Sequence, residues 1–208
     1  MIWLVDAQVK VYEEYDLNAR GLPAHIRILD KGDFEPIYEI TVKGIGEATR
    51  VLLLSLRHEL LSMVPIDPTR IEDKQYIDEL TQKYTQATKL LISKYLPGTD
   101  QETEKLLIAY VINVMLGLGD LEIPLADENL EEVVVNNAKE PIWVFHKKYG
   151  WCKTTLTINS EEIIYDYSEQ IGRRVGREIT NLSPLMDAEL PDGSRVNATL
   201  YPISQTGN

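Results

Sequence analysis

Two short segments near the C-terminus, residues 185–190 and 195–200, constrain the fold more than any other part of the chain. In both segments apolar and polar residues alternate, which is the pattern of a β-strand with one buried face. Between them, Pro191-Asp192-Gly193 favours a tight turn, because proline fixes φ, aspartate bonds nearby N–H groups and glycine accepts a positive φ. The two segments therefore predict a β-hairpin. Its polar face carries Asp187, Glu189, Arg195 and Asn197.

The residues before this hairpin predict a small α+β domain. Strands are expected at 131–136, 142–146 and 151–156, with a turn at 147–150 between the last two. A helix capped by Asn159 or Ser160 should follow, because apolar residues recur every three or four positions from Ile164 to Val175. Together with the hairpin, these elements predict one main helix packed on a small antiparallel sheet.

The first part of the chain predicts a three-helix bundle after one strand at 35–42. The helices are expected at 45–63, 67–95 and 99–117, and the third is apolar almost all round, which is typical of a buried helix. Asp67-Pro68 and the pair Thr99 and Glu102 are helix-start signals. Residues 1–33 contain only short strand-like runs, Trp3–Val5 and Ile26–Leu29, which Gly21-Leu22-Pro23 interrupts.

A change of composition suggests where the chain divides. Residues 120–127, DLEIPLAD, lie between the helical part and the strand-rich part, and we interpret them as a linker. The predicted division is therefore an N-terminal region with the bundle, 1–119, and an α+β domain, 128–208.

Overall charge and composition exclude some classes of protein. The net charge of -12 makes a nucleic-acid partner improbable, because phosphate binding requires a basic surface. A single cysteine excludes an internal disulfide and suits a reducing compartment. The longest apolar run, 106–118, is shorter than the ~20 residues of a membrane-spanning helix. These features predict a soluble, intracellular protein without an integral membrane segment.

The motifs of common catalytic and metal sites are missing or incomplete. The chain has no GxxxxGK[S/T] loop, which would supply backbone N–H groups and a lysine to a nucleotide. His146 and Cys152 flank one predicted turn, but two ligands do not make a zinc site. A cysteine–histidine nucleophile is possible in principle. The simpler interpretation is a surface histidine and a small buried cysteine, so we predict no metal site and no catalytic residue in this chain.

Four arginines stand out in an otherwise acidic chain, because they fall within 23 residues. Three of them belong to the predicted helix, where Arg173 and Arg177 fall opposite the apolar stripe and Arg174 flanks it, so a solvated helix face would explain these three. A cross-strand pair with Glu189 would explain the fourth, at roughly 0.2–1 kcal/mol. The four are Arg173, Arg174, Arg177 and Arg195.

Three segments of the second half resemble a known family. They are LEEVVVNNAKEPIWVFHKKYGWCKT, IIYDYSEQIGRRVGREIT and PLMDAELPDGSRVNATLYPIS. In this order they look like the N-terminal domain of the secretion ATPase superfamily, the hexameric motors of type II and type IV secretion, type IV pili and archaeal flagella. The first half is similar only to the archaeal branch, through PIYEITVKGIGEATRVLLLSLRHELL.

The resemblance implies a role for two of the arginines. In this family nucleotide lies between the N-terminal domain and a RecA-like motor domain, and arginines of the N-terminal domain reach its phosphates. The hairpin arginine of the family matches Arg195, and Arg177 in the GREI segment lies in the same neighbourhood. The expected cofactors, ATP and Mg²⁺, would bind only together with the motor domain, which should begin where this chain ends.

The resemblance also implies partners and a location. The full-length protein is expected to be a cytoplasmic homohexamer that works against a membrane platform protein at the inner face of the cell membrane. Without the motor domain the chain should have no ATPase activity of its own. The alternative is a stand-alone interaction or ligand-sensing module, because a small sheet with one helix is also the shape of sensor domains.

Overall fold

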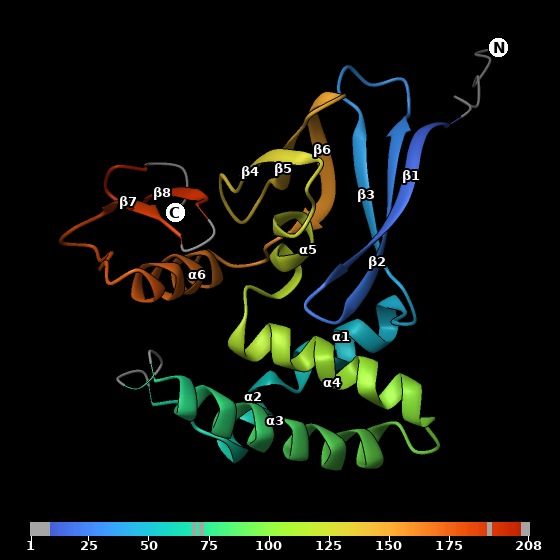
Figure 1. The fold of residues 1–208 in the computed structure, drawn as a ribbon, viewed down its shortest axis with the longest axis vertical. Helices are drawn as coiled ribbons and strands as arrows, with labels where there is room; N and C mark the ends of the chain where they lie inside the picture. Colours follow the sequence, from blue (N-terminus) through green and yellow to red (C-terminus); the bar gives the residue numbers. More distant parts are fainter. Residues whose placement is uncertain (1–8, 68–69, 71–72, 191–192, 205–208) are drawn as a thin grey trace. The chain divides into compact units, whose positions relative to one another are not determined.

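The structure is a computed structural model, and it describes residues 9–67, 70, 73–190 and 193–204. The chain forms an α+β fold, as predicted, with one sheet of six strands and one of two (Figure 1). Its residues fall into two compact units. The first comprises the described residues of 1–66, 80–133 and 143–156, and the second those of 67–79, 134–142 and 157–208. The predicted division at 120–127 stays a prediction.

The first unit is built on the six-stranded sheet, whose strand order is β1-β2-β3-β6-β5-β4. Its strands are β1 (Lys10–Ala19), β2 (Leu22–Asp30), β3 (Ile37–Val42), β4 (Leu130–Val134), β5 (Pro141–His146) and β6 (Gly150–Thr157). The predicted strands at 35–42, 131–136, 142–146 and 151–156 are confirmed. The sheet is mixed rather than antiparallel, because β3 pairs with β6 in parallel.

The N-terminal hairpin was only partly predicted. Ile26–Leu29 is indeed a strand, but Gly21 does not interrupt the structure, because Arg20 and Gly21 have positive φ and form the turn between β1 and β2. The sequence does not predict β1, because few of its residues are apolar and buried. Its pairing with β2 also shifts in register between Val11 and Glu13, and the sequence gives no sign of this shift. Trp3–Val5 lies outside the described residues.

Helices follow the first three strands: α1 (Glu47–Ser55), α2 (Arg57–Met63), α3 (Lys74–Tyr95) and α4 (Gln101–Leu116). The predicted helix 45–63 is thus two helices that meet at Leu56. α3 begins later than the predicted start at residue 67. Asp73 caps it by accepting hydrogen bonds from the N–H groups of Gln75 and Tyr76, at 2.9 and 3.3 Å. Pro68, part of the predicted start, lies outside the described residues.

The fourth helix has a different cap from the one predicted. Asp100, not Thr99, accepts from the backbone N–H groups of Glu102 and Thr103, each at 3.0 Å. The chain then continues through η2 (Gly119–Leu121) and α5 (Glu122–Leu125), so residues 120–125 of the expected linker 120–127 are helical. Its apolar residue Ile123 is fully buried in the core of the first unit, so the segment packs as part of that unit.

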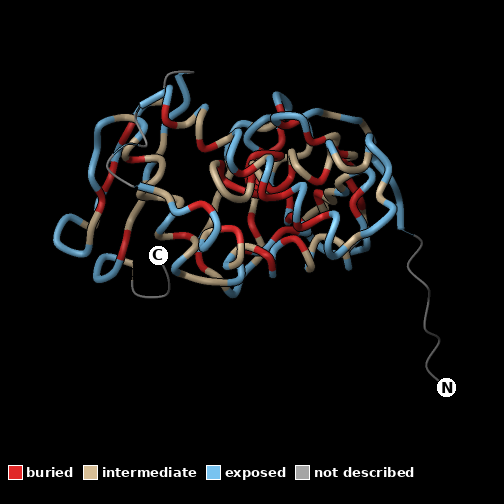
Figure 2. The backbone as a smooth tube through the Cα atoms, turned by 90° about the horizontal axis from the view of Figure 1, so that it is seen from below, coloured by how far each residue is buried: buried red, intermediate tan, exposed pale blue. Residues whose placement is uncertain are grey.

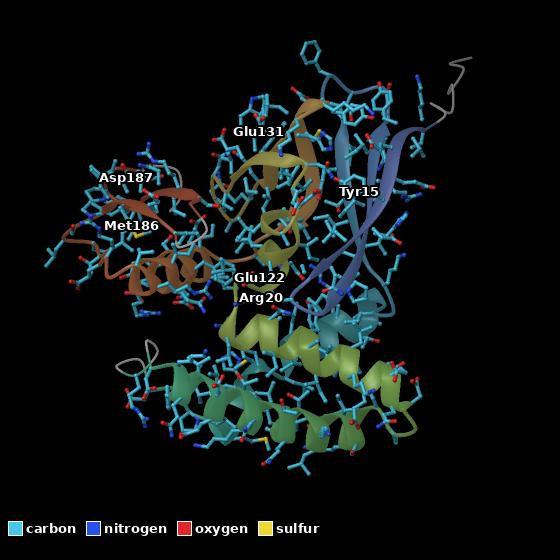
Figure 3. The ribbon with its side chains drawn as sticks, viewed as in Figure 1. Tyr15, Arg20, Glu122, Glu131, Met186 and Asp187 are labelled. Carbon is cyan, nitrogen blue, oxygen red and sulfur yellow. The ribbon has the colours of Figure 1, made fainter. Side chains whose placement is uncertain are left out.

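A buried polar cluster lies beside this core. The hydroxyl groups of Tyr15 and Tyr38 both donate to Oδ2 of Asp127 at 2.5 Å, and Asn129 donates to Oδ1 through its backbone and side chain. Burial, together with the hydrogen bond to Asp127, raises the pKa of both tyrosines. Tyr15 is labelled in Figure 3, and Figure 2 colours the backbone by burial, with buried residues in red. Asp127 therefore joins β1 and β3 to the segment after α5.

A second polar contact fixes the turn of the N-terminal hairpin. The guanidinium of Arg20 donates to Oε1 of Glu122 at 2.8 Å, and both residues are labelled in Figure 3. The same Oε1 accepts from the backbone N–H of Leu118. Gly117 lies between these groups, because a Cβ there would be 2.8 Å from both Glu122 Oε1 and the Asn113 carbonyl. Glu122, one of three charged residues in the expected linker, is therefore buried and paired.

The second unit contains α6 (Glu161–Arg174), β7 (Leu185–Glu189) and β8 (Arg195–Thr199). Ser160 caps α6, as predicted, by accepting from Glu162 N–H at 3.2 Å. β7 and β8 pair antiparallel in the predicted hairpin, and Gly193 has the expected positive φ of 86°. Pro191 and Asp192 lie outside the described residues. The apolar face of the hairpin packs against α6 through Met186, Ala188, Tyr165, Ile171 and Val175.

Among the helices of the described ranges, none is long and apolar enough to cross a membrane by itself. Only α4 combined with the segment Gly119–Leu125 has the required length and composition, and the chain bends by 105° between them.

Candidate functional site

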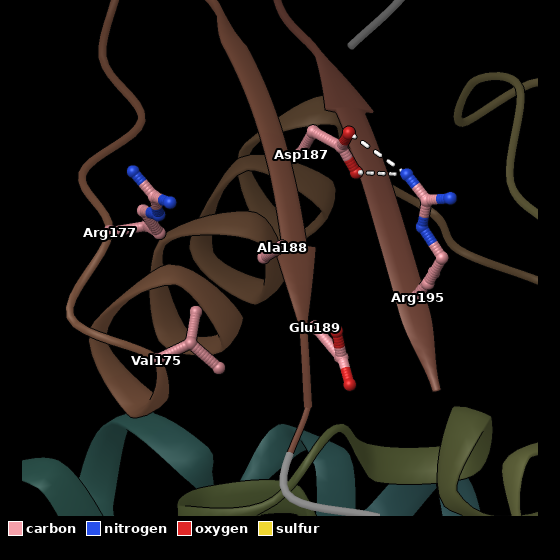
Figure 4. Close-up of a pocket in the computed structure, with 6 residues that line it drawn as sticks. All are labelled: Val175, Arg177, Asp187, Ala188, Glu189 and Arg195. Atoms are coloured by element: carbon pink, nitrogen blue, oxygen red, sulfur yellow. Dashed lines mark hydrogen bonds and ion pairs between the residues drawn. The ribbon is translucent and has the colours of Figure 1, made fainter. Parts of the chain in front are cut away.

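The second unit contains a pocket of about 420 Å³ between the end of α6 and the hairpin. Both arginines implied by the resemblance, Arg177 and Arg195, line it, although they are 18 positions apart in the sequence. Two carboxylates line the same pocket, so its charged groups balance (Figure 4). The full lining is Val175, Arg177, Asp187, Ala188, Glu189 and Arg195.

Arg195 is placed by the register of the hairpin. The strands pair so that Arg195 is directly opposite Glu189 and Asp187 is opposite Asn197. All four point away from the buried face that Met186 and Ala188 form on α6. The polar face predicted from the alternation is therefore confirmed.

The partner of Arg195 is not the expected one. Its Nη2 donates to both carboxylate oxygens of Asp187, at 3.1 and 3.4 Å, rather than to Glu189 (Figure 4). The side chains of Arg195 and Asp187 are 76% and 61% exposed. An ion pair this exposed contributes about 1 kcal/mol or less to stability. Among the described residues, the side chain of Glu189 has neither a hydrogen-bond nor an ion-pair partner.

Arg177 reaches the pocket through a helix-ending turn. α6 ends at Arg174, and Gly176 then adopts a positive φ of 63°, a conformation that glycine accepts without strain. The backbone N–H of Arg177 donates back to the carbonyl of Gly172 at 2.8 Å. A Cβ at Gly172 would lie 2.8 Å from the Arg177 carbonyl oxygen and 3.1 Å from Met186 Sδ. Only glycine at position 172 allows this close approach.

This turn corrects one sequence prediction. Arg177 was expected on the helix face opposite the apolar stripe, together with Arg173, but it lies beyond the helix and lines the pocket. Its guanidinium has no hydrogen-bond or ion-pair partner within the part of the chain that the structure describes. The other two arginines remain on α6, where Arg173 pairs with Glu169 at 3.1 Å across one helical turn.

The predicted surface histidine is buried instead. His146 is 3% exposed, its Nδ1 accepts from Lys148 N–H at 3.1 Å, and Nε2 has no partner among the described residues. Burial lowers the pKa of His146. Cys152 is buried as expected, and its burial raises the pKa of the thiol to about 11. A thiol with so high a pKa holds almost no thiolate at neutral pH and is a poor nucleophile.

Two residues with guanidinium groups, Arg177 and Arg195, line the pocket. One guanidinium group can contact two oxygens of a phosphate at once. A pocket lined by two such groups therefore suits a phosphate-bearing ligand better than a metal ion. Among the residues that the structure describes, no group of three or more histidine, cysteine or acidic side chains could hold a metal ion. Sequence reasoning found both arginines but missed Asp187 as the partner of Arg195, because a diagonal contact across a hairpin has no signal in the sequence.

Comparisons with known proteins point to archaeal relatives. No protein-family model matches the chain. The uncharacterized protein MJ1288 of Methanocaldococcus jannaschii is 27% identical over 202 residues, which cover 94% of this chain and 79% of MJ1288. The uncharacterized protein MJ0900 of the same archaeon is 29% identical over 194 residues, 85% of this chain. A third, MJ0781, is 46% identical over 90 residues, 43% of this chain. The chain spans 35% of the length of MJ0900 and 12% of that of MJ0781.

Proposed function

We propose that this chain is the N-terminal, nucleotide-capping region of a hexameric ATPase of the secretion superfamily. In this proposal it closes over ATP and Mg²⁺ held by a motor domain and passes the resulting movement to a membrane platform protein. The protein would work in the cytoplasm, at the inner face of the membrane.

One observation carries the proposal: Arg177 and Arg195 line a single pocket. The resemblance named these two residues on sequence grounds alone, and they come from different elements. During phosphoryl transfer, negative charge is spread over the γ-phosphoryl oxygens, and a guanidinium can contact two of them at once. The described partners of Arg195 leave Nε and Nη1 without a hydrogen bond, so donors remain for a ligand.

Two further observations support the proposal. In MJ0900 and MJ0781 the region similar to this chain is a minor part of a longer protein, as a capping region would be. The chain itself has no GxxxxGK[S/T] loop, so a nucleotide would need a second domain to bind its phosphates in the usual way. On this basis the purified 208-residue chain should not hydrolyse ATP.

The test is made in the complete motor, in which this region is joined to its motor domain. Arg195→Ala should lower kcat, because arginines that contact the transferred phosphoryl group are worth about 10³-fold or more. We expect a smaller loss here, because Arg177 would share the contact. Lysine should restore only part of the rate, since an ammonium group cannot bind two oxygens in one plane.

A matched control separates catalysis from folding. Arg173→Ala removes an arginine from the same unit, but one that pairs with Glu169 on α6 instead of lining the pocket. Its ATP turnover should equal that of the wild type, and the melting temperature of Arg195→Ala should change little. Equal turnover in Arg195→Ala and the wild type would refute the phosphate contact of Arg195 on which the proposal depends.

A further inference from the structure

One carboxylate of the pocket, Asp187, already accepts hydrogen bonds from Arg195, the arginine that contacts phosphate in the proposed function. Asp187 places both of its oxygens on Nη2 of Arg195, at 3.1 and 3.4 Å. A carboxylate and a phosphate offer a guanidinium the same kind of acceptor, two or more oxygens with negative charge. The side chain of Asp187 therefore holds Arg195 in the way a phosphate group would.

The choice of partner makes this contact specific. Glu189 is directly opposite Arg195 in the hairpin and also lines the pocket, yet Arg195 reaches diagonally past it to Asp187. Directly opposite side chains are the usual pairs on an antiparallel sheet. The two acids thus carry the same charge in the same pocket, but only Asp187 contacts the guanidinium among the described residues.

We infer that Asp187 is a built-in competitor that sets the selectivity of the pocket for phosphate-bearing anions. This inference rests on the proposed function, because it assumes that Arg195 meets a phosphate. A free monocarboxylate gains little at this arginine, since it would replace an identical group that the chain already holds in place. A phosphate that carries more than one negative charge is attracted to Arg195 more strongly than Asp187 is, because each additional charge strengthens its attraction to both arginines.

The strength of the competition follows from the exposure of the pair. Exposed ion pairs are weak, so their loss changes an affinity by about two- to fivefold. Asp187 therefore lowers the affinity for phosphate without preventing binding. When the ligand leaves, Arg195 returns to Asp187 instead of extending into solvent.

The experiment uses the 208-residue chain and inorganic tripolyphosphate, with binding followed by NMR at low ionic strength. Four proteins are compared: the wild type, Asp187→Asn, Glu189→Gln and Arg195→Gln. Asp187→Asn and Glu189→Gln each remove one negative charge from the pocket, but only the first frees Arg195. We expect Asp187→Asn to bind about two- to fivefold more tightly than Glu189→Gln. Arg195→Gln should bind more weakly than the wild type, and melting temperatures report whether each variant is folded.

The outcomes separate this inference from the proposed function. If the two charge-removing variants bind equally tightly, the effect is one of charge alone and the competitor role is refuted, while the arginine site stands. Weaker binding by Asp187→Asn would also refute it and would make Asp187 a residue that positions Arg195. If Arg195→Gln binds as well as the wild type, or if no protein binds, the inference is refuted, while the proposed function, in which a motor domain supplies the other phosphate contacts, is decided by the turnover of Arg195→Ala in the complete motor.

Discussion

Tyr38→Phe should destabilise the first unit although it removes only one oxygen atom. Tyr38 is fully buried, and its hydroxyl donates to Asp127 at 2.5 Å. Phenylalanine keeps the ring in place, so no large cavity forms. Hydrogen bonds to charged groups contribute about 1.5–3 kcal/mol. Asp127 keeps its bonds from Tyr15 and Asn129, so we expect the free energy of unfolding to fall by about 1.5–3 kcal/mol.

Tyr12→Phe is the matched control for this measurement. Tyr12 lies on the same strand as Tyr15, and its hydroxyl also donates to a carboxylate, Asp30, at 2.6 Å, but this contact is exposed to water. The same atom is removed from the same kind of bond, and only the burial differs. Water replaces the lost contact at Tyr12, so the change there should be much smaller.

The assay is urea-induced unfolding at pH 7, followed by circular dichroism. Equal m-values in the two variants would show that both lose stability rather than change how they unfold. In a protein of this size, a loss of 1.5–3 kcal/mol corresponds to a fall in melting temperature of roughly 3–12 °C. If Tyr38→Phe and Tyr12→Phe lower the free energy of unfolding equally, the Asp127 cluster does not stabilise the unit and the reasoning is wrong.

Three further predictions concern the same unit. Burial and Asp127 raise the pKa of Tyr38 above 10, so the contribution of Tyr38 to the free energy of unfolding should be complete below pH ~10 and be lost above it, and stability above pH ~10 should fall less steeply in Tyr38→Phe. Burial lowers the pKa of His146, so stability should be complete above pH ~6.5 and decline as the pH drops through the lower folded value; an NMR titration of its ring measures that value. Gly117→Ala should cost about 1–3 kcal/mol, because its Cβ would meet the fixed carbonyl of Asn113 at 2.8 Å; an unchanged melting temperature would contradict this.

Elements that depend on near neighbours could be predicted from the sequence. The hairpin of β7 and β8 carries its own alternation and turn, and Ser160 caps α6 next to the apolar stripe. Both were predicted with their buried faces. The alternation also placed Arg195 on the polar side. Such features need only a few consecutive residues, so the sequence contains the whole signal.

Elements that depend on distant partners could not be predicted. Glu122 reads as an exposed linker residue, yet Arg20, 102 positions away, makes its burial possible. The parallel pairing of β3 with β6 has no local pattern at all. The prediction for Arg177 is wrong for a different reason. It continues the helix past Gly176, whereas the positive φ of Gly176 turns the chain toward the pocket.

The parallel pairing of β3 with β6 also determines when this part of the sheet can form during synthesis. Tyr38 of β3 pairs with Thr154 of β6, which leaves the ribosome more than a hundred residues later. At about 5–20 residues per second, the delay is roughly 5–20 s. During that time β1, β2 and β3 can pair with one another, but one side of β3 stays open to any other strand in the cell. Nascent chains halted before β6 has left the ribosome should therefore recruit chaperones, whereas chains halted after β6 has fully left it should not.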